Sequence, residues 1–299
     1  MGFFKGHKGR RSYDLLSNYN YFMPSYVNLL WVVLLMAVGV FIGTLILEPF
    51  MKLCYQHEVE TYGMLIAYPL MFIPAMIYAS AVSRHNDGFI TSYAVDSNSF
   101  GSRKGITMAF AAFVMALATA YLIEPVGLLL PEMSEDMVKT MESLLNGPAW
   151  VALLSVSIFA PFFEEWLCRG IILRGLLNKV GPAWSIIISA AFFAAIHMNL
   201  WQAVPAFFMG LVFGYVYYKT GSLKLTMLMH FANNTMAFIV SRIPSLKDAD
   251  YFFDVISPWA YAGVYIIAAV ALVFGFILFK GIPQKEGNLG GCQKLDSIF

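Results

Sequence analysis

Charge is scarce in this sequence. Only 12% of its 299 residues are charged and 59% are hydrophobic, whereas an ordinary soluble domain carries about a quarter charged residues. This composition excludes a soluble globular domain and indicates a polytopic membrane protein surrounded by lipid. The formal net charge is only +1, so the chain lacks the basic excess with which proteins bind nucleic acids. No nucleic-acid partner is expected.

Cysteine is equally scarce. The chain has three cysteines, Cys54, Cys168 and Cys292. A disulfide framework requires paired cysteines in one oxidising compartment, and the topology predicted below places no two of them together. We therefore expect three free thiols.

Long apolar runs, in contrast, are abundant. A membrane-spanning helix needs about 20 mostly apolar residues. Eight segments are candidate spans: 27–48, 62–82, 105–130, 148–177, 183–200, 203–218, 223–241 and 259–280. The fourth is too long for one simple span, so its end is expected to project into the cytoplasm. The predicted fold is an all-α membrane bundle of about eight transmembrane helices.

Lysine and arginine indicate the orientation, because they accumulate in cytoplasmic loops. With the N-terminus inside, fifteen of the nineteen basic residues lie on the inner side, and only Lys52, Lys139, Arg242 and Lys247 lie outside. Both termini are therefore expected in the cytoplasm, and the membrane is the plasma membrane if the host is bacterial. The expected organisation is a basic segment 1–20, a transmembrane domain 21–282 and a flexible tail 283–299.

A few ionisable residues interrupt the apolar runs. Such groups are costly at membrane depth, and they usually face a partner or a cavity. They are Glu124, Glu164, Glu165, Arg169, His197 and His230, with Asn233 and Asn234 following the last. Glu124 precedes a proline near the outer end of the third span, which favours an interface residue over a catalyst. The others fall in the later half of the chain and are the candidates for chemistry.

Helical geometry separates the two adjacent glutamates. Successive residues of an α-helix point about 100° apart, so Glu164 and Glu165 cannot share a face. Glu165 lies four residues before Arg169, which is the favourable order for an ion pair along one face. Glu164 has no such partner within its own helix. We expect Glu165 and Arg169 to support the structure and Glu164 to remain available for other work.

The two membrane histidines are expected near Glu164. Glu164 and His197 lie at similar distances from the turn at 178–182, so an antiparallel helix pair places them at about the same depth. His230 lies about two helical turns from the start of its span, and Asn234 follows it on the same face. His230 reaches the level of Glu164 only if the turn at 178–182 protrudes from the membrane. Asn233 is rotated away and is the weaker candidate.

Glu164, His197, His230 and Asn234 together suit hydrolysis. A carboxylate beside an imidazole can hold and deprotonate a water molecule, and a second imidazole with an amide can stabilise an oxyanion. Alternatively, Glu164, His197 and His230 could act as the three ligands of a catalytic zinc ion. The spacing does not match His-Glu-x-x-His. The residues alone leave open a divalent metal such as zinc and a metal-free mechanism.

Three motifs resemble those of the CAAX-processing and bacteriocin-processing intramembrane proteases, the CPBP or Abi family, which includes the Rce1-type prenyl-protein endopeptidases. Glu164, Glu165 and Arg169 match Glu-Glu-x-x-x-Arg. Phe-x-x-x-His is matched at 193–197 and His-x-x-x-Asn at 230–234. All three occur in family order on separate predicted helices, and the resemblance covers about 145–242.

The resemblance implies a role for each motif residue. Glu164 and His197 would handle the catalytic water, His230 and Asn234 would stabilise the oxyanion, and Glu165 with Arg169 would support them. The family is commonly labelled metalloprotease, and a metal-free glutamate mechanism has also been argued for it. The implied partner is a membrane-associated peptide or protein substrate, of which a prenylated CAAX protein is one type.

The leading hypothesis is therefore an intramembrane endopeptidase whose site opens to the cytoplasmic half of the bilayer. One alternative is a non-catalytic membrane scaffold or bacteriocin-immunity-type protein. Another is a transporter or proton relay, which requires polar residues through both halves of the membrane. The outer half of the predicted spans has almost no such residues, which disfavours a transporter.

Overall fold

The computed structural model describes residues 15–53, 56–87, 94–101, 104–139, 147–246, 249 and 251–283. Most of the predicted basic segment, nearly all of the predicted tail, Cys54 and Cys292 lie outside these residues. Cys168 is buried as a free thiol, as the sequence predicts.

The described chain is helical throughout and contains no β-strand. The longer helices are α1 (Tyr26–Leu53), α2 (Gln56–Asn86), α3 (Gly105–Ile123), α8 (Pro182–Ala195), α9 (Leu200–Thr220), α10 (Leu223–Arg242) and α11 (Pro258–Lys280). The fourth predicted span consists of consecutive pieces, namely α5 (Ala149–Ala152), η4 (Leu153–Phe159), α6 (Ala160–Glu165), η5 (Trp166–Leu173) and α7 (Arg174–Leu177). Three short 3₁₀ turns are also present: η1 (Leu15–Tyr19), η3 (Glu124–Leu129) and η6 (Phe252–Asp254).

All eight predicted segments are thus helical, and the chain is an integral membrane protein of the all-α class. Within the described residues, six helices are long and apolar enough to cross a membrane. The two remaining segments are α8, which is apolar but shorter, and α10, whose polar residues lower its hydropathy. A count of eight crossings stays a prediction.

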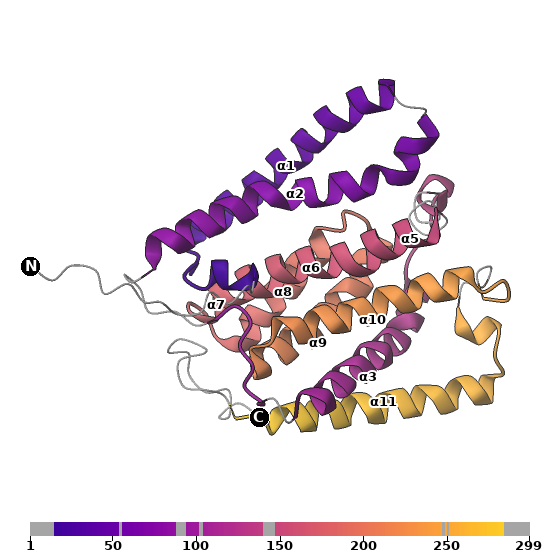
Figure 1. The fold of residues 1–299 in the computed structure, drawn as a ribbon. Helices are drawn as coiled ribbons and strands as arrows, with labels where there is room; N and C mark the ends of the chain where they lie inside the picture. The colour runs from indigo at the N-terminus through magenta and orange to yellow at the C-terminus, as the bar shows by residue number, and fades with distance from the viewer. Residues whose placement is uncertain are drawn as a thin grey trace, which may run out of the picture.

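The helices run alternately up and down the bundle, so that α1 begins and α11 ends at the same end (Figure 1). We call this the near end, and the end that holds η3 and the turn between α8 and α9 the far end. The α1–α2 hairpin forms one outer layer, α3 and α11 form the opposite one, and the fourth span lies between them with α8, α9 and α10 (Figure 1). The candidate residues therefore lie in the central layer.

The fourth span is not a regular α-helix. Its segments η4 and η5 are π-helical, and they flank the short α6 that carries both glutamates. The N–H of Ala160 bonds to the carbonyl of Ser155, five residues back, and the N–H of Arg174 bonds to that of Arg169. Long π stretches are rare, and π turns occur frequently at functional sites. The assumption of uniform α geometry is therefore wrong for this span, although it holds over α6.

The near end of the fourth span is covered by the N-terminal segment. Arg174, which the orientation count treats as a loop charge, is fully buried. Its guanidinium donates to the carbonyls of Tyr19, at 3.1 Å, and of Asn20 and Phe22. The span thus ends beneath η1 and the residues after it. The expected projection of its end into the cytoplasm stays a prediction.

Glycines permit the closest helix contacts. Gly210 and Gly214 form a Gly-x-x-x-Gly pair, which predicts close packing. A Cβ on Gly210 would lie 2.9 Å from the Cβ of Ala190, and one on Gly214 would lie 3.1 Å from Ile186. The predicted close approach is therefore confirmed between α9 and α8. Gly39 is tighter still, because its Cβ would lie 2.4 Å from the backbone oxygen of Met71 on α2.

We predict that Gly39→Ala lowers the stability of the detergent-solubilised protein, because the added methyl group meets backbone that cannot rotate away. Overpacking of this kind typically costs about 1–3 kcal/mol. The matched control is Gly43→Ala, one helical turn later, where the nearest atom would be 3.9 Å away. Thermal unfolding of the two variants should separate them. Equal melting temperatures would contradict the α1–α2 packing.

Candidate active site

A buried ion pair lies at the centre of the site. The Nη1 of Arg169 lies 2.6 Å from the Oε1 of Glu165, and both side chains are fully buried. The Nη2 of Arg169 donates to the carbonyl of Gly210 at 3.2 Å. The predicted Glu165–Arg169 pair is therefore confirmed, and it connects the fourth span to α9 at the glycine where α9 approaches α8.

Two aromatic rings enclose this pair. The guanidinium carbon of Arg169 lies 4.6 Å from the ring centre of Phe193 and 5.3 Å from that of Phe213. Cations are attracted to aromatic faces, more strongly where water is excluded. Phe193 is the first residue of the second motif. Its ring packs against the Arg169 guanidinium, and its carbonyl contacts His197 four residues later.

His230 joins the ion pair, which the sequence did not predict. Its Nδ1 lies 3.0 Å from the Oε1 of Glu165. An ionised carboxylate only accepts hydrogen bonds, so Nδ1 carries the hydrogen and Glu165 determines the orientation of the ring. The other nitrogen, Nε2, lies 3.8 Å from the Oε2 of Glu164. The two adjacent glutamates thus face opposite sides of one imidazole.

Glu164 differs from Glu165 in its surroundings. Its Oε1 accepts a hydrogen bond from the hydroxyl of Tyr68 on α2. Its Oε2 is buried and has no hydrogen-bond partner among the described residues. Glu164 therefore has one oxygen that is held in place and one that is available at the wall of a cavity. Tyr68 is one of 16 tyrosines, and no spacing in the sequence distinguishes it.

His197 lies in the turn immediately after α8 and is partly exposed. Its Nδ1 lies 2.8 Å from the carbonyl oxygen of Phe193, four residues earlier. Because a carbonyl oxygen accepts, Nδ1 carries the hydrogen and the lone pair lies on Nε2. His197 lines the same cavity as Glu164, although the described residues show no direct hydrogen bond between the two side chains.

Asn234 is held by two contacts. Its Nδ2 donates to the carbonyl of Val156 in the π-helical η4 at 2.8 Å, and its Oδ1 accepts from the Nδ2 of Asn233 at 3.0 Å. An amide nitrogen carries two hydrogens, so one remains for another acceptor. Asn233 also lines the cavity. The expectation that Asn233 is rotated away from the site is therefore wrong.

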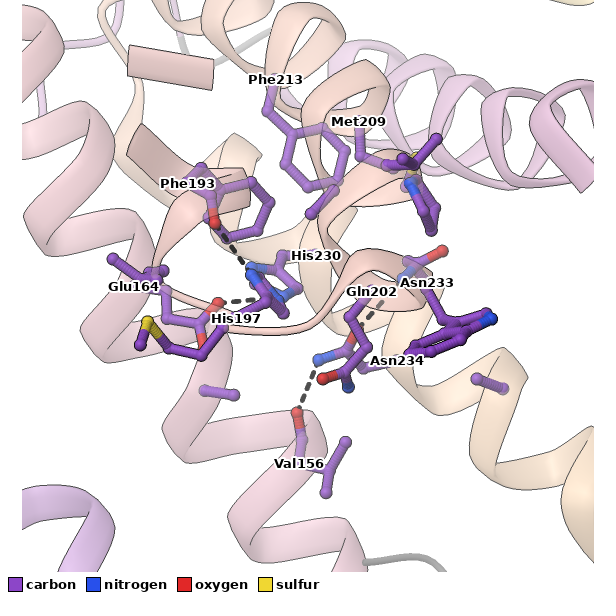
Figure 2. Close-up of a pocket in the computed structure, with 18 of the residues that line it drawn as sticks. Val156, Glu164, Phe193, His197, Gln202, Met209, Phe213, His230, Asn233 and Asn234 are labelled. Carbon is purple, nitrogen blue, oxygen red and sulfur yellow. Dashed lines mark hydrogen bonds and ion pairs between the residues drawn. The ribbon is translucent and has the colours of Figure 1, made fainter. Parts of the chain in front are cut away.

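These residues line one cavity of about 830 Å³. Figure 2 shows Glu164, His197, His230 and Asn234 projecting toward it from the fourth span, the α8–α9 turn and α10. The close approach of His230 and Glu164 places them at one depth, as the sequence predicts. The volume of the cavity falls within the range of ligand pockets, about 300–1,000 Å³.

The cavity extends from Glu164 toward the far end of the bundle. Glu124 and Gln202 line it there, together with Asn233. The expectation that this half is nearly bare of polar groups is therefore wrong. Glu124 accepts hydrogen bonds from the backbone N–H of Phe252 and the hydroxyl of Tyr261, so it connects η3 to η6 and α11.

The residues do not form a metal site as they stand. In the part of the chain that the structure describes, no three His, Cys, Asp or Glu side chains are grouped to hold a metal ion. The Nδ1 of His230 and that of His197 contact other groups, so Nε2 is the nitrogen that each ring can present to a ligand. The steps proposed below therefore use only side chains of this chain.

Comparison with protein families supports the resemblance. Residues 146–236 match the family described as type II CAAX prenyl endopeptidase Rce1-like. No curated protein and no solved structure matches the chain. The matched segment contains all three motifs and all the candidate residues from Glu164 to Asn234. Residues 146–236 of this integral membrane protein are therefore similar to the Rce1-like family of CAAX-type intramembrane proteases.

Proposed function

We propose that the protein is an intramembrane endopeptidase that hydrolyses a peptide bond of a membrane-associated substrate with a water activated by Glu164. The observation that carries this proposal is the asymmetry of the Glu164 carboxylate. The hydroxyl of Tyr68 holds its Oε1, while its buried Oε2 lacks a hydrogen-bond partner within the described structure and faces the cavity. A general base needs such an oxygen available to the reacting water.

In the first step, the Oε2 of Glu164 takes a proton from the water, and the resulting hydroxyl attacks the carbonyl carbon of the scissile peptide. The Nε2 of His197 accepts the second hydrogen of the same water and so orients it. This role is consistent with the hydrogen bond from Nδ1 to Phe193, which leaves Nε2 with its lone pair.

The carbonyl oxygen becomes an oxyanion in this step and needs hydrogen-bond donors. Protonated His230 donates from Nε2, and its positive charge is stabilised by Glu165, which contacts Nδ1. Asn234 donates through the Nδ2 hydrogen that Val156 does not use. Donors held in advance in a site of low polarity stabilise developing charge more strongly than they would in water.

In the second step, Glu164 returns its proton to the amide nitrogen, the carbon–nitrogen bond breaks, and the new amine and carboxylic acid leave. One carboxyl group thus serves first as base and then as acid. The wall of the cavity suits an apolar substrate, because Met36, Met64, Met71 and Met209 contribute to it and methionine side chains adapt to irregular shapes. A CAAX-type prenylated peptide is one substrate of this class.

We predict that Glu164→Gln reduces proteolysis of a reporter peptide about 10²- to 10⁴-fold, which is the usual contribution of a general base. The variant should remain folded, because the Glu165–Arg169 pair is intact. Glu165→Gln is the matched change one residue away. It breaks the buried pair, at a typical cost of about 3–5 kcal/mol.

Activity and thermal unfolding of the two variants should therefore dissociate: Glu164→Gln loses activity at near-normal stability, and Glu165→Gln loses stability. Full activity in Glu164→Gln would contradict the proposed mechanism and favour a non-catalytic scaffold.

We predict that Tyr68→Phe lowers kcat roughly tenfold or more and leaves KM nearly unchanged, because it removes only the hydrogen bond that orients the base. A hydrogen bond to a charged group contributes about 1.5–3 kcal/mol. Tyr62→Phe, on the same helix but packed on Trp150, is the control and should keep wild-type rates. Equal rates in both variants would remove Tyr68 from the mechanism.

We predict that activity of the purified protein survives treatment with a strong chelator, because the described residues do not form a metal-binding group. Metal content measured on the same sample shows whether the treatment was complete. Activity that is lost with the metal and restored by zinc would instead support the three-ligand alternative of Glu164, His197 and His230.

A further inference from the structure

Along the fourth span and α10, the cavity extends from the candidate catalytic level in one direction. On α10 it is lined by His230 and by residues that follow toward the far end, as far as Ala237. On the fourth span it is lined by Glu164 and by residues that precede it, from Ser155 onward, which also lie toward the far end. On α9 it is lined from Trp201 to Phe213, the first part of that helix. The fourth span and α10 therefore open the site toward the far end, and Phe193 and Phe213, which enclose Arg169, line its closed end.

The opposite direction is closed. Every residue from 166 to 177, which continues the fourth span toward the near end, is buried. On the near-end side of Glu164, the guanidinium of Arg169 lies between the rings of Phe193 and Phe213. Closer to the near end, Arg174 donates hydrogen bonds to backbone carbonyls of the segment that begins with η1. A substrate that reached the near end would meet packed side chains.

The basic residues indicate which membrane face each end occupies. If the buried Arg169 and Arg174 are set aside, six of the described basic residues lie at the near end, and three, Lys52, Lys139 and Arg242, lie at the far end. Described examples at the near end are Lys104, Lys219 and Lys280, which lie at the start of α3 and the ends of α9 and α11. Because cytoplasmic segments accumulate lysine and arginine, the far end faces away from the cytoplasm.

We infer that the site receives its substrate from the extracytoplasmic side of the membrane. This inference rests on the proposed function and adds the class of substrate to it: a membrane-anchored peptide whose scissile segment lies in the outer half of the bilayer or just outside it. It replaces the access from the cytoplasmic half that the sequence suggested.

The opening is formed by the α8–α9 turn. Met198 lines the cavity and is 90% exposed. Trp201 also lines the cavity, and its indole N–H donates to the carbonyl of Pro131 at 3.0 Å, which attaches the start of α9 to the residues after η3. A peptide entering between these elements would reach His197 before Glu164, since His197 lies in the same turn.

The side of the opening can be measured without any protease activity. In a variant with Cys54→Ser, Cys168→Ala and Cys292→Ser, single cysteines would be introduced as Met198→Cys at the opening and Lys280→Cys at the near end. A membrane-impermeant maleimide is added to intact cells and to inverted vesicles. We expect Met198→Cys to react in intact cells and Lys280→Cys to react in inverted vesicles. Leu200→Cys, at the start of α9, replaces Met198→Cys if the latter does not fold.

Labelling of Met198→Cys only in inverted vesicles would overturn the inference. A second measurement tests the substrate class, using two single-span reporters that carry the same scissile segment on opposite sides of the membrane. We expect Glu164-dependent cleavage of the extracytoplasmic reporter, and cleavage of only the cytoplasmic one would overturn the inference. If neither reporter is cleaved, the proposed protease function fails, while the labelling still decides the side of the opening.

Discussion

The site depends on one buried charge cluster, formed by Glu165, Arg169 and His230. An isolated charge in a membrane interior is very costly, so a buried carboxylate must be paired and hydrogen-bonded. Glu165 accepts from both Arg169 and His230, and Arg169 also donates to Gly210 on α9. The Glu165 carboxylate thus joins the fourth span to α10, and Arg169 joins the same span to α9. Breaking the Glu165–Arg169 contact would leave uncompensated charge at the centre of the bundle.

This cluster also determines what Glu164 can do. Because Glu165 occupies the Nδ1 of His230, the ring presents Nε2 to Glu164. Tyr68 holds the other oxygen of Glu164 from α2, so the outer α1–α2 hairpin contributes to the orientation of the base. The site is therefore assembled from both an outer layer and the central layer, and the close packing of α1 on α2 at Gly39 matters to the chemistry.

The irregular fourth span separates an open half of the molecule from a closed one. Its π-helical segments lie on either side of the glutamates; η4 supplies the carbonyl that holds Asn234, and η5 is buried throughout. Along this span the cavity is lined by Glu164 and by residues that precede it, and by none of the buried residues that follow it. A transporter would need a polar route in both directions, and the described residues provide one in the far half alone.

The sequence by itself determined the membrane class, the helical segments and the Glu165–Arg169 pair, because these follow from hydropathy and from spacing within single helices. Only the tertiary structure decided the contact of Tyr68 with Glu164, the contact of Glu165 with His230 and the burial of Arg174. Each of these joins residues more than 60 positions apart, or a side chain to distant backbone, so no local periodicity encodes it. The direction of the cavity was likewise decided by packing, because it depends on which ends of several helices leave space between their side chains.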